Sequence, residues 1–371
     1  MILSEEIYFY TTFRFNGGAE ANLLKLVRHL SKRGDMVYVL FLSCHNLEVG
    51  SIWEKMDNVN YLYSPTKRES LGCFWLMWII LFERKFSGMT FDCSFSSHVH
   101  CNALISTLKR FHFLKIKRLV LRESTNIFSW FKGLKLRLIS LLYKLYDRRA
   151  CLVCQTQRMK DELVSNIPEF CSMDVRVVKN PIDTQFLSER KVNTCKVVEN
   201  LLPTLNNSKI ILAVGRLVKE KAYDILIDAL AILDKECQLL IVGEGPERIN
   251  LENQVRSKGL EGRVHFVGGL INPYPLMAHC HLGVISSRLE GFPNVLLEQM
   301  FLAPKVVSTL CAAGVESIPG ILTCETESSI ALSRVINAAL VQEQECARKN
   351  KVLMLQYVDK LSVESFFNKI S

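Results

Sequence analysis

The stretch KIILAVGRLVKEKAYDILIDALAILDKECQLLIVGEG, residues 209–245, contains two short apolar runs separated by a longer amphipathic segment. The runs KIILAVGR and QLLIVG are almost continuously aliphatic, which is typical of strands that are buried on both faces. The segment between them, AYDILIDALAILDK, has the apolar spacing of a helix. A strand, a helix and a second strand in this order predict a parallel sheet covered by helices.

The same alternation extends through the whole chain in two series. The first series contains IYFYTT, MVYVLFLS, NVNYLY, FDCSFSS, RLVLRES, CLVCQT and VRVVKN, and the second continues with RVHFVGG, HLGVISS and KVVST. The polar region 180–208 between them contains prolines and is interpreted as a linker with its flanks. A chain of 371 residues suits two domains. We expect an α/β protein with two Rossmann-like parallel-sheet domains, residues 1–185 and 186–371, facing a central cleft. The C-terminal helix packing back on the first domain is one alternative.

The composition indicates a globular protein, with 49% hydrophobic and 22% charged residues. The 13 cysteines are odd in number and scattered, which favours reduced thiols in a cytoplasm over a disulfide framework. The first residues, MILSEEIYFYTT, lack the basic region of a secretory signal. The longest apolar run, LGCFWLMWIILF at residues 71–82, is shorter than the ~20 residues of a membrane span. It predicts either a buried helix or one that lies in a membrane interface.

Positive charge is concentrated in residues 101–150, which hold twelve Lys or Arg and two Asp or Glu, while the whole chain has a net charge of +9. Within this region, FKGLKLRLISLLYKLYDRR places leucines at helical spacing between cations. A basic amphipathic helix of this kind indicates an anionic membrane surface. A solvated helix whose leucines pack in the core is the alternative. Aromatic stacking residues and a base-reading motif are not evident, so we expect no nucleic-acid partner.

The stretch SSRLEGFPNVLLEQM, residues 286–300, follows a predicted strand, at the sheet edge where open α/β sheets bind ligands. Glu290 lies in the turn, Pro293 suits a first helical turn, and Glu298 follows on the helix. A helix N-terminus holds phosphate, whereas carboxylates accept hydrogen bonds from hydroxyls. The pattern therefore indicates a nucleoside diphosphate sugar. Alternatively, Glu290 serves the helix dipole and Glu298 lies on the surface.

Two cations, Arg216 and Lys221, follow the first strand of the second series and could neutralise a departing diphosphate. Gly243 and Gly245 allow either close approach of a ring or ribose, or only a tight turn. An Asp-x-Asp motif, which would suit a magnesium or manganese ion, does not occur. We therefore expect neither a metal nor another cofactor.

Several motifs together resemble the retaining glycosyltransferases of family 4, whose architecture is called GT-B. They are GRL (215–217) with Lys221, VGEGP (242–246), FVG (266–268), EGFPNVLLE (290–298), KVVST (305–309), Gly314–Glu316, NGGAE (16–20) and KNPID (179–183). The resemblance covers nearly the whole chain, and EGFPNVLLE is its specific part. The chain departs from the family pattern at Lys221-Ala222, where Lys-Gly is common, and at Ala303-Pro304.

The resemblance implies roles for the residues of these motifs. Glu290 would contact the hydroxyls of the donor sugar, and Glu298 those of the ribose. Arg216 and Lys221 would stabilise the leaving diphosphate. The backbone would hold sugar, phosphate and base at a set of loop residues, namely Gly243, Gly245, Gly268, Gly291, Phe292, Pro293 and Asn294. In the first domain, Gly17 and Gly18 would let a helix N-terminus approach the diphosphate.

The acceptor side is predicted from residues at the carboxyl ends of strands in the first domain. His98 and His100 follow FDCSFSS, and a similar histidine in relatives lies near the reaction centre, where it would act as a general base or hydrogen-bond donor. Arg122 and Glu123 end the strand RLVLRES and are acceptor candidates. Loop residues without a special role are the alternative for both pairs.

The expected function is a bacterial hexosyltransferase that uses a nucleotide sugar, with UDP preferred to GDP. The acceptor would be a lipid-linked saccharide of surface polysaccharide synthesis, such as O-antigen, capsule or lipopolysaccharide. The protein would be cytoplasmic and peripheral on the inner face of the cell membrane. A nucleotide-sugar epimerase of the same fold and a non-catalytic nucleotide-sugar binding protein are the alternatives.

Overall fold

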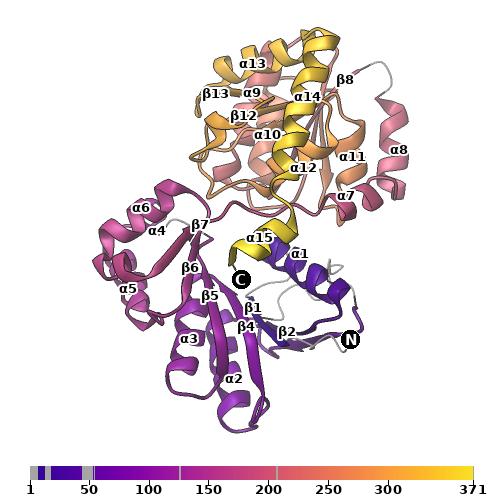
Figure 1. Cartoon of the computed structure of the whole chain (residues 1–371). Coiled ribbons are helices and arrows are strands. Elements are labelled where there is room, and N and C mark those ends of the chain that lie inside the picture. The colour runs from indigo at the N-terminus through magenta and orange to yellow at the C-terminus, as the bar shows by residue number, and fades with distance from the viewer. Residues whose placement is uncertain are drawn as a thin grey trace. The chain divides into compact units, whose positions relative to one another are not determined.

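The computed structural model describes residues 7–12, 18–43, 53, 55–124, 127–205 and 208–370. The chain divides into two compact units (Figure 1). The first unit comprises Met1–Pro181 together with Val363–Ser371, and the second comprises Ile182–Ser362. The chain thus leaves the first unit at Pro181, four residues before the boundary expected from the sequence, and returns to it at Val363.

The first unit is built on a seven-stranded sheet with the order β3-β2-β1-β4-β5-β6-β7, in which every pairing is parallel. Its strands are β1 (Ile7–Thr12), β2 (Met36–Phe41), β3 (Val59–Tyr63), β4 (Thr90–Ser97), β5 (Lys115–Arg122), β6 (Cys151–Cys154) and β7 (Asp174–Val177). The strand order reverses at β1. All carboxyl ends lie at one edge of the sheet, because the strands are parallel.

Helices cover both faces of this sheet. They are α1 (Gly18–Arg33), α2 (Glu69–Leu81), α3 (Val99–Arg110), α4 (Ile127–Trp130), α5 (Gly133–Leu142), α6 (Gln157–Asn166) and α15 (Val363–Ile370), with short 3₁₀ turns at Tyr143–Leu145 and Pro168–Ser172. Side chains of α2, α3 and α5 share one hydrophobic core, whereas α1 and α15 share another. The sheet therefore lies between two cores, as expected for a parallel sheet.

The last helix, α15, completes the second of these cores. Phe366 and Phe367 are buried there with residues of α1, and the Phe366 ring meets that of Phe95 at 6.5 Å. Arg118 Nε also donates a hydrogen bond of 2.8 Å to the carbonyl oxygen of Ile370. The first unit is consequently assembled from both ends of the described chain.

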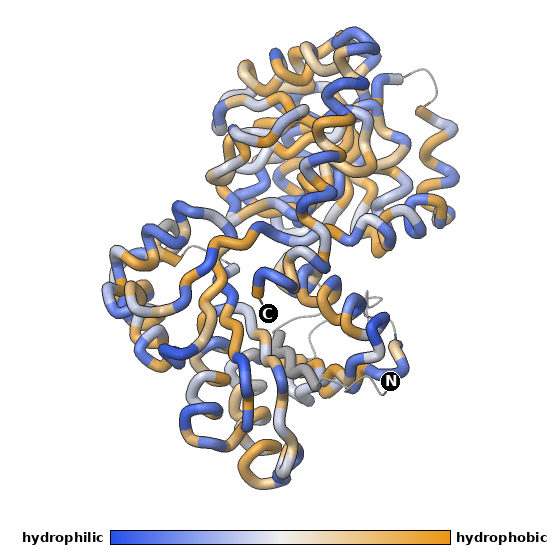
Figure 2. The backbone as a smooth tube through the Cα atoms, viewed as in Figure 1, coloured by the Kyte–Doolittle hydropathy of each residue, from blue (hydrophilic) through white to orange (hydrophobic). Residues whose placement is uncertain are grey.

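The second unit has a six-stranded sheet with the order β10-β9-β8-β11-β12-β13, again parallel throughout. Its strands are β8 (Lys209–Val214), β9 (Cys237–Val242), β10 (Val264–Gly268), β11 (Leu282–Ile285), β12 (Val306–Thr309) and β13 (Leu322–Cys324). Its helices are α7 (Thr184–Arg190), α8 (Lys196–Thr204), α9 (Tyr223–Ile232), α10 (Arg248–Ser257), α11 (Tyr274–His279), α12 (Asn294–Leu302), α13 (Ser329–Val341) and α14 (Gln344–Asp359), and short 3₁₀ turns lie at Lys219–Lys221 and Val315–Ser317. Figure 2 shows orange apolar stretches along the strands of each unit.

The interpretation of residues 180–208 as a linker is wrong for most of that region. Helices α7 and α8 occupy it, and both contribute buried side chains to the core of the second unit, among them Leu187 and Val198. Proline and polar residues suggested a loop, but Asp183 caps α7 by accepting a hydrogen bond from the backbone of Phe186 at 3.0 Å. Pro203 lies in the last turn of α8, where its missing N–H removes one helical hydrogen bond just before the helix ends.

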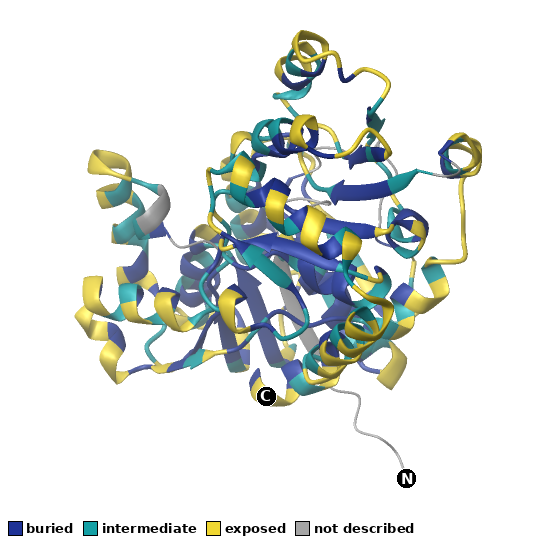
Figure 3. Ribbon diagram, turned by 90° about the horizontal axis from the view of Figure 1, so that it is seen from above, coloured by how far each residue is buried: buried dark blue, intermediate teal, exposed yellow. Residues whose placement is uncertain are grey.

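Helix α2 contains most of the apolar run 71–82 and is buried on only one face. Leu76, Ile79 and Ile80 lie in the core, whereas Phe74 and Trp78 are exposed. Helix α5 behaves similarly, because Leu136 and Ile139 pack against the core. Of the leucines predicted to form a stripe, Leu142 packs against the core as well, whereas four are exposed, namely Leu134, Leu138, Leu141 and, in the following 3₁₀ turn, Leu145. Figure 3 shows such exposed outer faces in yellow, against strands in dark blue. None of the helices in the described part of the chain has both the length and the apolar character needed to cross a membrane.

Gly72 allows α2 to approach the end of β2, and this contact gives a testable prediction. A Cβ atom at Gly72 would lie 1.7 Å from the carbonyl oxygen of Leu42. We expect Gly72→Ala to lower the free energy of unfolding by about 1–3 kcal/mol, because backbone must shift to relieve the clash. Urea denaturation measures the change.

Gly262→Ala is the matched control, since a Cβ atom there meets no atom within 4 Å. That variant should stay within about 0.5 kcal/mol of the parent protein. Equal stabilities of the two variants would contradict the close packing of α2 on β2.

Candidate functional site

The carboxyl edge of the second sheet is formed by loops that follow β8, β9 and β10 and are joined by backbone hydrogen bonds. The amide of Gly215 donates to the carbonyl oxygen of Val242, and that of Gly243 to Gly268, both at 2.9 Å. The amide of Leu217 donates to Glu244 at 2.9 Å. The loops thus form a continuous backbone surface at the place where such sheets bind ligands.

Two of the predicted donor-binding glycines are required by this backbone surface itself. A Cβ atom at Gly243 would lie 1.9 Å from the carbonyl oxygen of Gly215, and one at Gly245 would lie 2.4 Å from that of Leu217. Gly268 has a φ of +83°, a conformation that side chains disfavour. The tight-turn alternative for Gly243 and Gly245 therefore explains these residues without a ligand.

The side chains of Lys221 and Glu290 form an ion pair at this edge. Lys221 Nζ lies 2.6 Å from Glu290 Oε1, and the two side chains are 20% and 19% exposed. Ser287 Oγ donates to the same carboxylate oxygen at 2.9 Å. The structure therefore joins two predicted residues that are 69 positions apart in the sequence. Each already has a partner of opposite charge, so a ligand has to compete with that partner.

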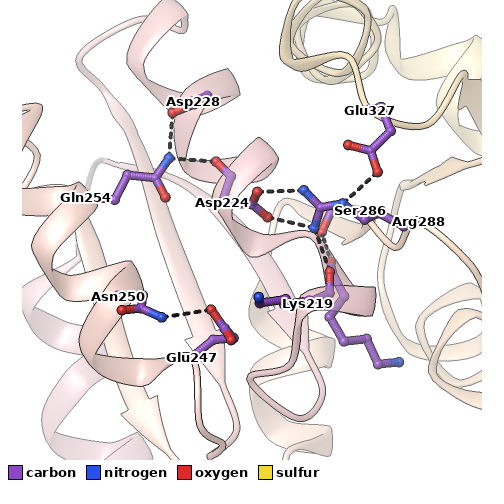
Figure 4. Close-up of polar contacts among 10 residues, drawn as sticks. Lys219, Asp224, Asp228, Glu247, Asn250, Gln254, Ser286, Arg288 and Glu327 are labelled. Carbon is purple, nitrogen blue, oxygen red and sulfur yellow. Dashed lines mark hydrogen bonds and ion pairs between the residues drawn. The ribbon is translucent and has the colours of Figure 1, made fainter.

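Arg288 fastens the loop that carries Glu290, although sequence reasoning did not single out this arginine. Its guanidinium forms a two-pronged contact with Asp224, at 2.9 and 2.6 Å, and an ion pair with Glu327 at 2.6 Å (Figure 4). It also donates to the carbonyl oxygen of Lys219 at 2.5 Å. Burial alone would raise the pKa of the half-exposed Asp224 carboxyl, but the contacts with Arg288 outweigh it and lower that pKa, and the same contacts raise the pKa of the arginine. A bidentate arginine of this kind fixes geometry as well as charge.

Tyr223 is a second residue that sequence reasoning missed. It is 3% exposed, and its hydroxyl forms no hydrogen bond with the described residues. Burial, and secondly the carboxylate of Glu290, hold the pKa of this phenol above its ordinary value. The hydroxyl lies 2.9 Å from the position that a Cβ atom of Gly215 would take, beside the aliphatic stem of Lys221. A buried donor without a partner is costly, so it marks a place where a ligand or water is expected.

The remaining predicted donor residues occupy the same edge with different exposures. Arg216 is exposed directly after β8, and Glu298 is buried on α12. Gly291 is partly exposed, Phe292 and Pro293 are buried, and Asn294 begins α12. Pro293 is therefore the residue just before the helix rather than a residue of its first turn.

The first unit brings three of the four predicted acceptor-side residues to the carboxyl edge of its sheet. His98 Nδ1 is 3.0 Å from Ser124 Oγ, and its Nε2 is 3.4 Å from a carboxylate oxygen of Glu20 on α1. His98 has a φ of +78°, which is uncommon for a residue with a side chain. Arg122 and Glu123 end β5 close by, whereas His100 is exposed in the first turn of α3.

Glu123 lies in a buried network of hydrogen bonds. Its carboxylate accepts bonds from the hydroxyls of Tyr146 and Tyr143, at 2.7 and 3.2 Å, and from Asn102 Nδ2 at 3.1 Å. Burial raises the pKa of Glu123 to about 7, and these hydrogen bonds oppose part of the shift. A carboxyl group of this kind can hold or release a proton near neutral pH.

Arg122 is fully buried beside this network. One guanidinium nitrogen donates to Asn180 Oδ1 at 2.6 Å, while Nε and Nη1 have no hydrogen-bond partner among the described residues. Burial lowers the pKa of Arg122 to about 10, and the carboxylates of Glu20 and Glu123 oppose that shift. Arg122 therefore has spare donors for an anionic or hydroxyl-bearing group.

The two sets of residues belong to different units and are described separately. Gly18 begins α1 in the first unit, and Gly17 lies outside the described residues. Within the described residues, no group of three or more His, Cys, Asp or Glu side chains is arranged to hold a metal ion.

Comparison with known proteins relates this chain to sugar transfer. Residues 208–342 match the family model described as glycosyl transferases group 1. An N-acetylgalactosaminyltransferase of Campylobacter jejuni, which acts on a diphospho-undecaprenol-linked sugar according to its name, is 31% identical over 186 residues, or 49% of this chain and 47% of that protein. The lipopolysaccharide core biosynthesis glycosyltransferase LpsE of Rhizobium meliloti is 32% identical over 159 residues, or 43% of this chain and 44% of that protein. The chain therefore spans about half the length of these curated relatives.

Solved structures match over almost the whole chain. Anabaena HepE, in complex with UDP-glucose, superposes with a TM-score of 0.79 over 98% of both chains, at 18% identity. The lipopolysaccharide outer core galactosyltransferase WaaB superposes with a TM-score of 0.67 over 98% of this chain and 99% of that chain, at 19% identity. This level of identity shows the fold alone. The chain has the GT-B fold, with two Rossmann-like units, and its residues 208–342 are similar to the glycosyl transferases group 1 family.

Proposed function

We propose that this protein is a retaining glycosyltransferase that moves a hexose from a UDP-sugar to a lipid-linked saccharide in the synthesis of a surface polysaccharide. The observation that carries the proposal is the ion pair of Lys221 and Glu290 at the carboxyl edge of the second sheet, within the region similar to the group 1 family. A lysine and a carboxylate side by side suit a ligand that places an anionic phosphate next to sugar hydroxyls.

In this proposal, the bond between the anomeric carbon and the diphosphate oxygen breaks, and a bond from the anomeric carbon to an acceptor hydroxyl oxygen forms. The proton of that hydroxyl passes to the departing diphosphate. Lys221 and Arg216 stabilise the negative charge that develops on the leaving diphosphate. Glu290 orients the hexose through its hydroxyls, and Glu298 holds the ribose. These cations and the N-terminus of α12 would do the work of a metal ion, so we propose that the reaction needs none.

The names and bound ligands of similar proteins support the donor, the acceptor and the biosynthetic role in this proposal. The complexes of HepE with UDP and with UDP-glucose support a UDP-sugar donor. The name of the Campylobacter jejuni transferase supports an acceptor carried on a polyprenyl diphosphate. LpsE, and the O-antigen biosynthesis glycosyltransferase WclY of Escherichia coli at 31% identity over 95 residues, support a role in surface polysaccharides.

On the acceptor side, we assign His98 and His100 to the neighbourhood of the attacking hydroxyl, with Arg122 and Glu123 orienting the acceptor. The spare donors of Arg122 and the near-neutral pKa of Glu123 support this assignment. The basic segment 101–150 would hold the protein at the anionic inner face of the cell membrane, where such an acceptor is presented.

The roles of the two glutamates separate in one experiment. We expect Glu290→Gln to lower kcat by about 100-fold or more while UDP still stabilises the protein against heat, because the lost contact is with the sugar. Glu298→Ala should instead abolish stabilisation by UDP, which amounts to about 2.7 kcal/mol at 100 times the dissociation constant. Transfer assays and thermal unfolding measure the two effects.

Glu261, which is exposed, provides the control. Glu261→Gln should change neither kcat nor the stabilisation by UDP. A Glu290→Gln variant with normal turnover would refute the proposed transferase site. Stabilisation by GDP but not by UDP would show that the donor is a GDP-sugar. Stabilisation by neither nucleotide would contradict the proposal of a nucleotide-sugar donor.

The unpartnered hydroxyl of Tyr223 gives a second prediction. We propose that it bonds to Glu290 or to a phosphate oxygen once the diphosphate draws Lys221 away. Tyr223→Phe should therefore leave the ligand-free protein as stable as before, or stabilise it by about 1–3 kcal/mol, while stabilisation by UDP decreases. Thermal unfolding with and without UDP measures both.

Tyr146→Phe is the matched control, because the Tyr146 hydroxyl donates to Glu123 at 2.7 Å. That variant should lose stability without UDP and keep the UDP shift. If Tyr223→Phe responds in the same way, the hydroxyl is structural and not part of the donor site.

Glu123 predicts how stability depends on pH. The unfolded chain releases the proton of this carboxyl near pH 4.5, whereas the folded protein keeps it until about pH 7. Between these values the folded state binds more protons, so stability falls by roughly 3 kcal/mol as the pH rises, and this contribution is constant above pH 7. Glu123→Gln should remove this part of the pH dependence.

Urea denaturation of both proteins at pH 5 and pH 8 measures the effect. The stability of Glu123→Gln relative to the parent should increase at the higher pH. An unchanged difference between the two proteins at both pH values would show that Glu123 is ionised in the folded state.

A further inference from the structure

Helix α2 presents an apolar stripe to solvent along its whole length. Phe74, Trp78 and Phe82 are spaced four residues apart and are 66%, 55% and 67% exposed. The rings of Trp78 and Phe82 stack with centroids 4.4 Å apart. Leu71, one turn earlier, is exposed as well. Single exposed apolar residues are ordinary, but a contiguous aromatic stripe marks an interaction surface.

Further exposed aromatic side chains follow α3, the next helix along the chain. Helix α3 contributes to the same core as α2, and Phe111 and Phe113 just beyond its end are also exposed. These residues precede β5 and Phe82 precedes β4, and the starts of the two strands pair at Thr90 and Lys115. Phe82 and the two later phenylalanines therefore lie at the same edge of the sheet.

Exposed cations flank this apolar surface. Lys67 and Arg68 precede α2, Arg84 and Lys85 follow it, and Arg110 and Lys115 lie around the two phenylalanines after α3. Among the described residues of these short segments, the exposed acid is Glu83. Aromatic side chains bordered by cations suit a layer whose headgroups are anionic and whose interior is apolar.

We propose that α2 lies in the interface of an anionic bilayer, with Phe74, Trp78 and Phe82 inserted at the boundary between headgroups and acyl chains. This deepens the proposed function, because it rests on an acceptor held in a membrane. It adds to the proposed role of segment 101–150, whose start borders this surface: α2 contributes aromatic side chains that insert into the bilayer.

The charges favour a lipid surface over a second copy of the chain. A self-associated pair would bring the flanking cations of both copies together, and like charges in contact oppose association. An anionic bilayer instead attracts these cations, because its headgroups carry the opposite charge. Self-association through α2 is therefore the outcome that the test has to distinguish.

The test measures binding of the full chain to vesicles of phosphatidylcholine with phosphatidylglycerol, and to vesicles of phosphatidylcholine alone. The variant is Phe74→Ser, Trp78→Ser and Phe82→Ser together. We expect its partition onto the anionic vesicles to fall roughly 10-fold or more, because each lost ring removes apolar surface from the bilayer. The matched control replaces Ile232, Ile249 and Val352, which are similarly exposed in the second unit, by serine.

Insertion is read out directly from Trp78. Lipids brominated on their acyl chains should quench tryptophan fluorescence of the parent protein, and Trp78→Phe should lose most of that quenching while still binding. Full binding of the triple-serine variant, or equal quenching in Trp78→Phe, would overturn the proposal. So would a dimer of the parent protein that the triple variant converts to a monomer while vesicle binding is unchanged.

The result is independent of the proposed chemistry, because stabilisation by UDP is measured on the same variants without lipid. Normal UDP stabilisation with lost vesicle binding supports the anchor. If UDP does not stabilise the parent protein, the proposed donor site is contradicted, whereas the proposed membrane contact of α2 is not affected.

Discussion

The close approach of backbones at the carboxyl edge of the second sheet is the constraint on which the candidate site depends. Parallel pairing brings the loops after β8, β9 and β10 together, and Gly243 sits so near the carbonyl oxygen of Gly215 that a Cβ atom has no room. The loop after β8 then turns through Ala222, which adopts a left-handed conformation at a φ of +51°. This path presents Lys221 to the loop that Arg288 fastens, and it buries the hydroxyl of Tyr223 between them.

The ion pair of Lys221 and Glu290 has a consequence for ligand binding. The two charged side chains are about one-fifth exposed and stabilise each other. In the proposed complex, the donor diphosphate would attract Lys221 and so leave the Glu290 carboxylate available to the sugar hydroxyls. Ser287 already donates to the carboxylate and can keep it in place as the lysine moves.

The sequence predicted the parts of this protein that depend on local periodicity. Aliphatic runs separated by amphipathic helices identified the two sheets, and Glu290 and Lys221 were found because they follow strands. Arg288 and Tyr223 were missed because their importance lies in contacts with Asp224 and Glu327 and in burial, which no spacing reveals. The sequence also left open whether α2 is fully buried or exposed on one face, since an apolar helix that is half buried has no distinct pattern. Residues 180–208 were misread because composition outweighed the capping signal at Asp183.

Hydrogen–deuterium exchange with and without UDP tests the central claim most directly, because it locates the nucleotide on the chain. The account predicts slower exchange in peptides that cover residues 215–224 and 286–298, with the strands of the first unit unaffected. Protection of the second unit only outside these peptides and outside the loops at residues 243–245 and 268, or no protection by UDP at concentrations that stabilise the protein, would contradict the proposed donor site.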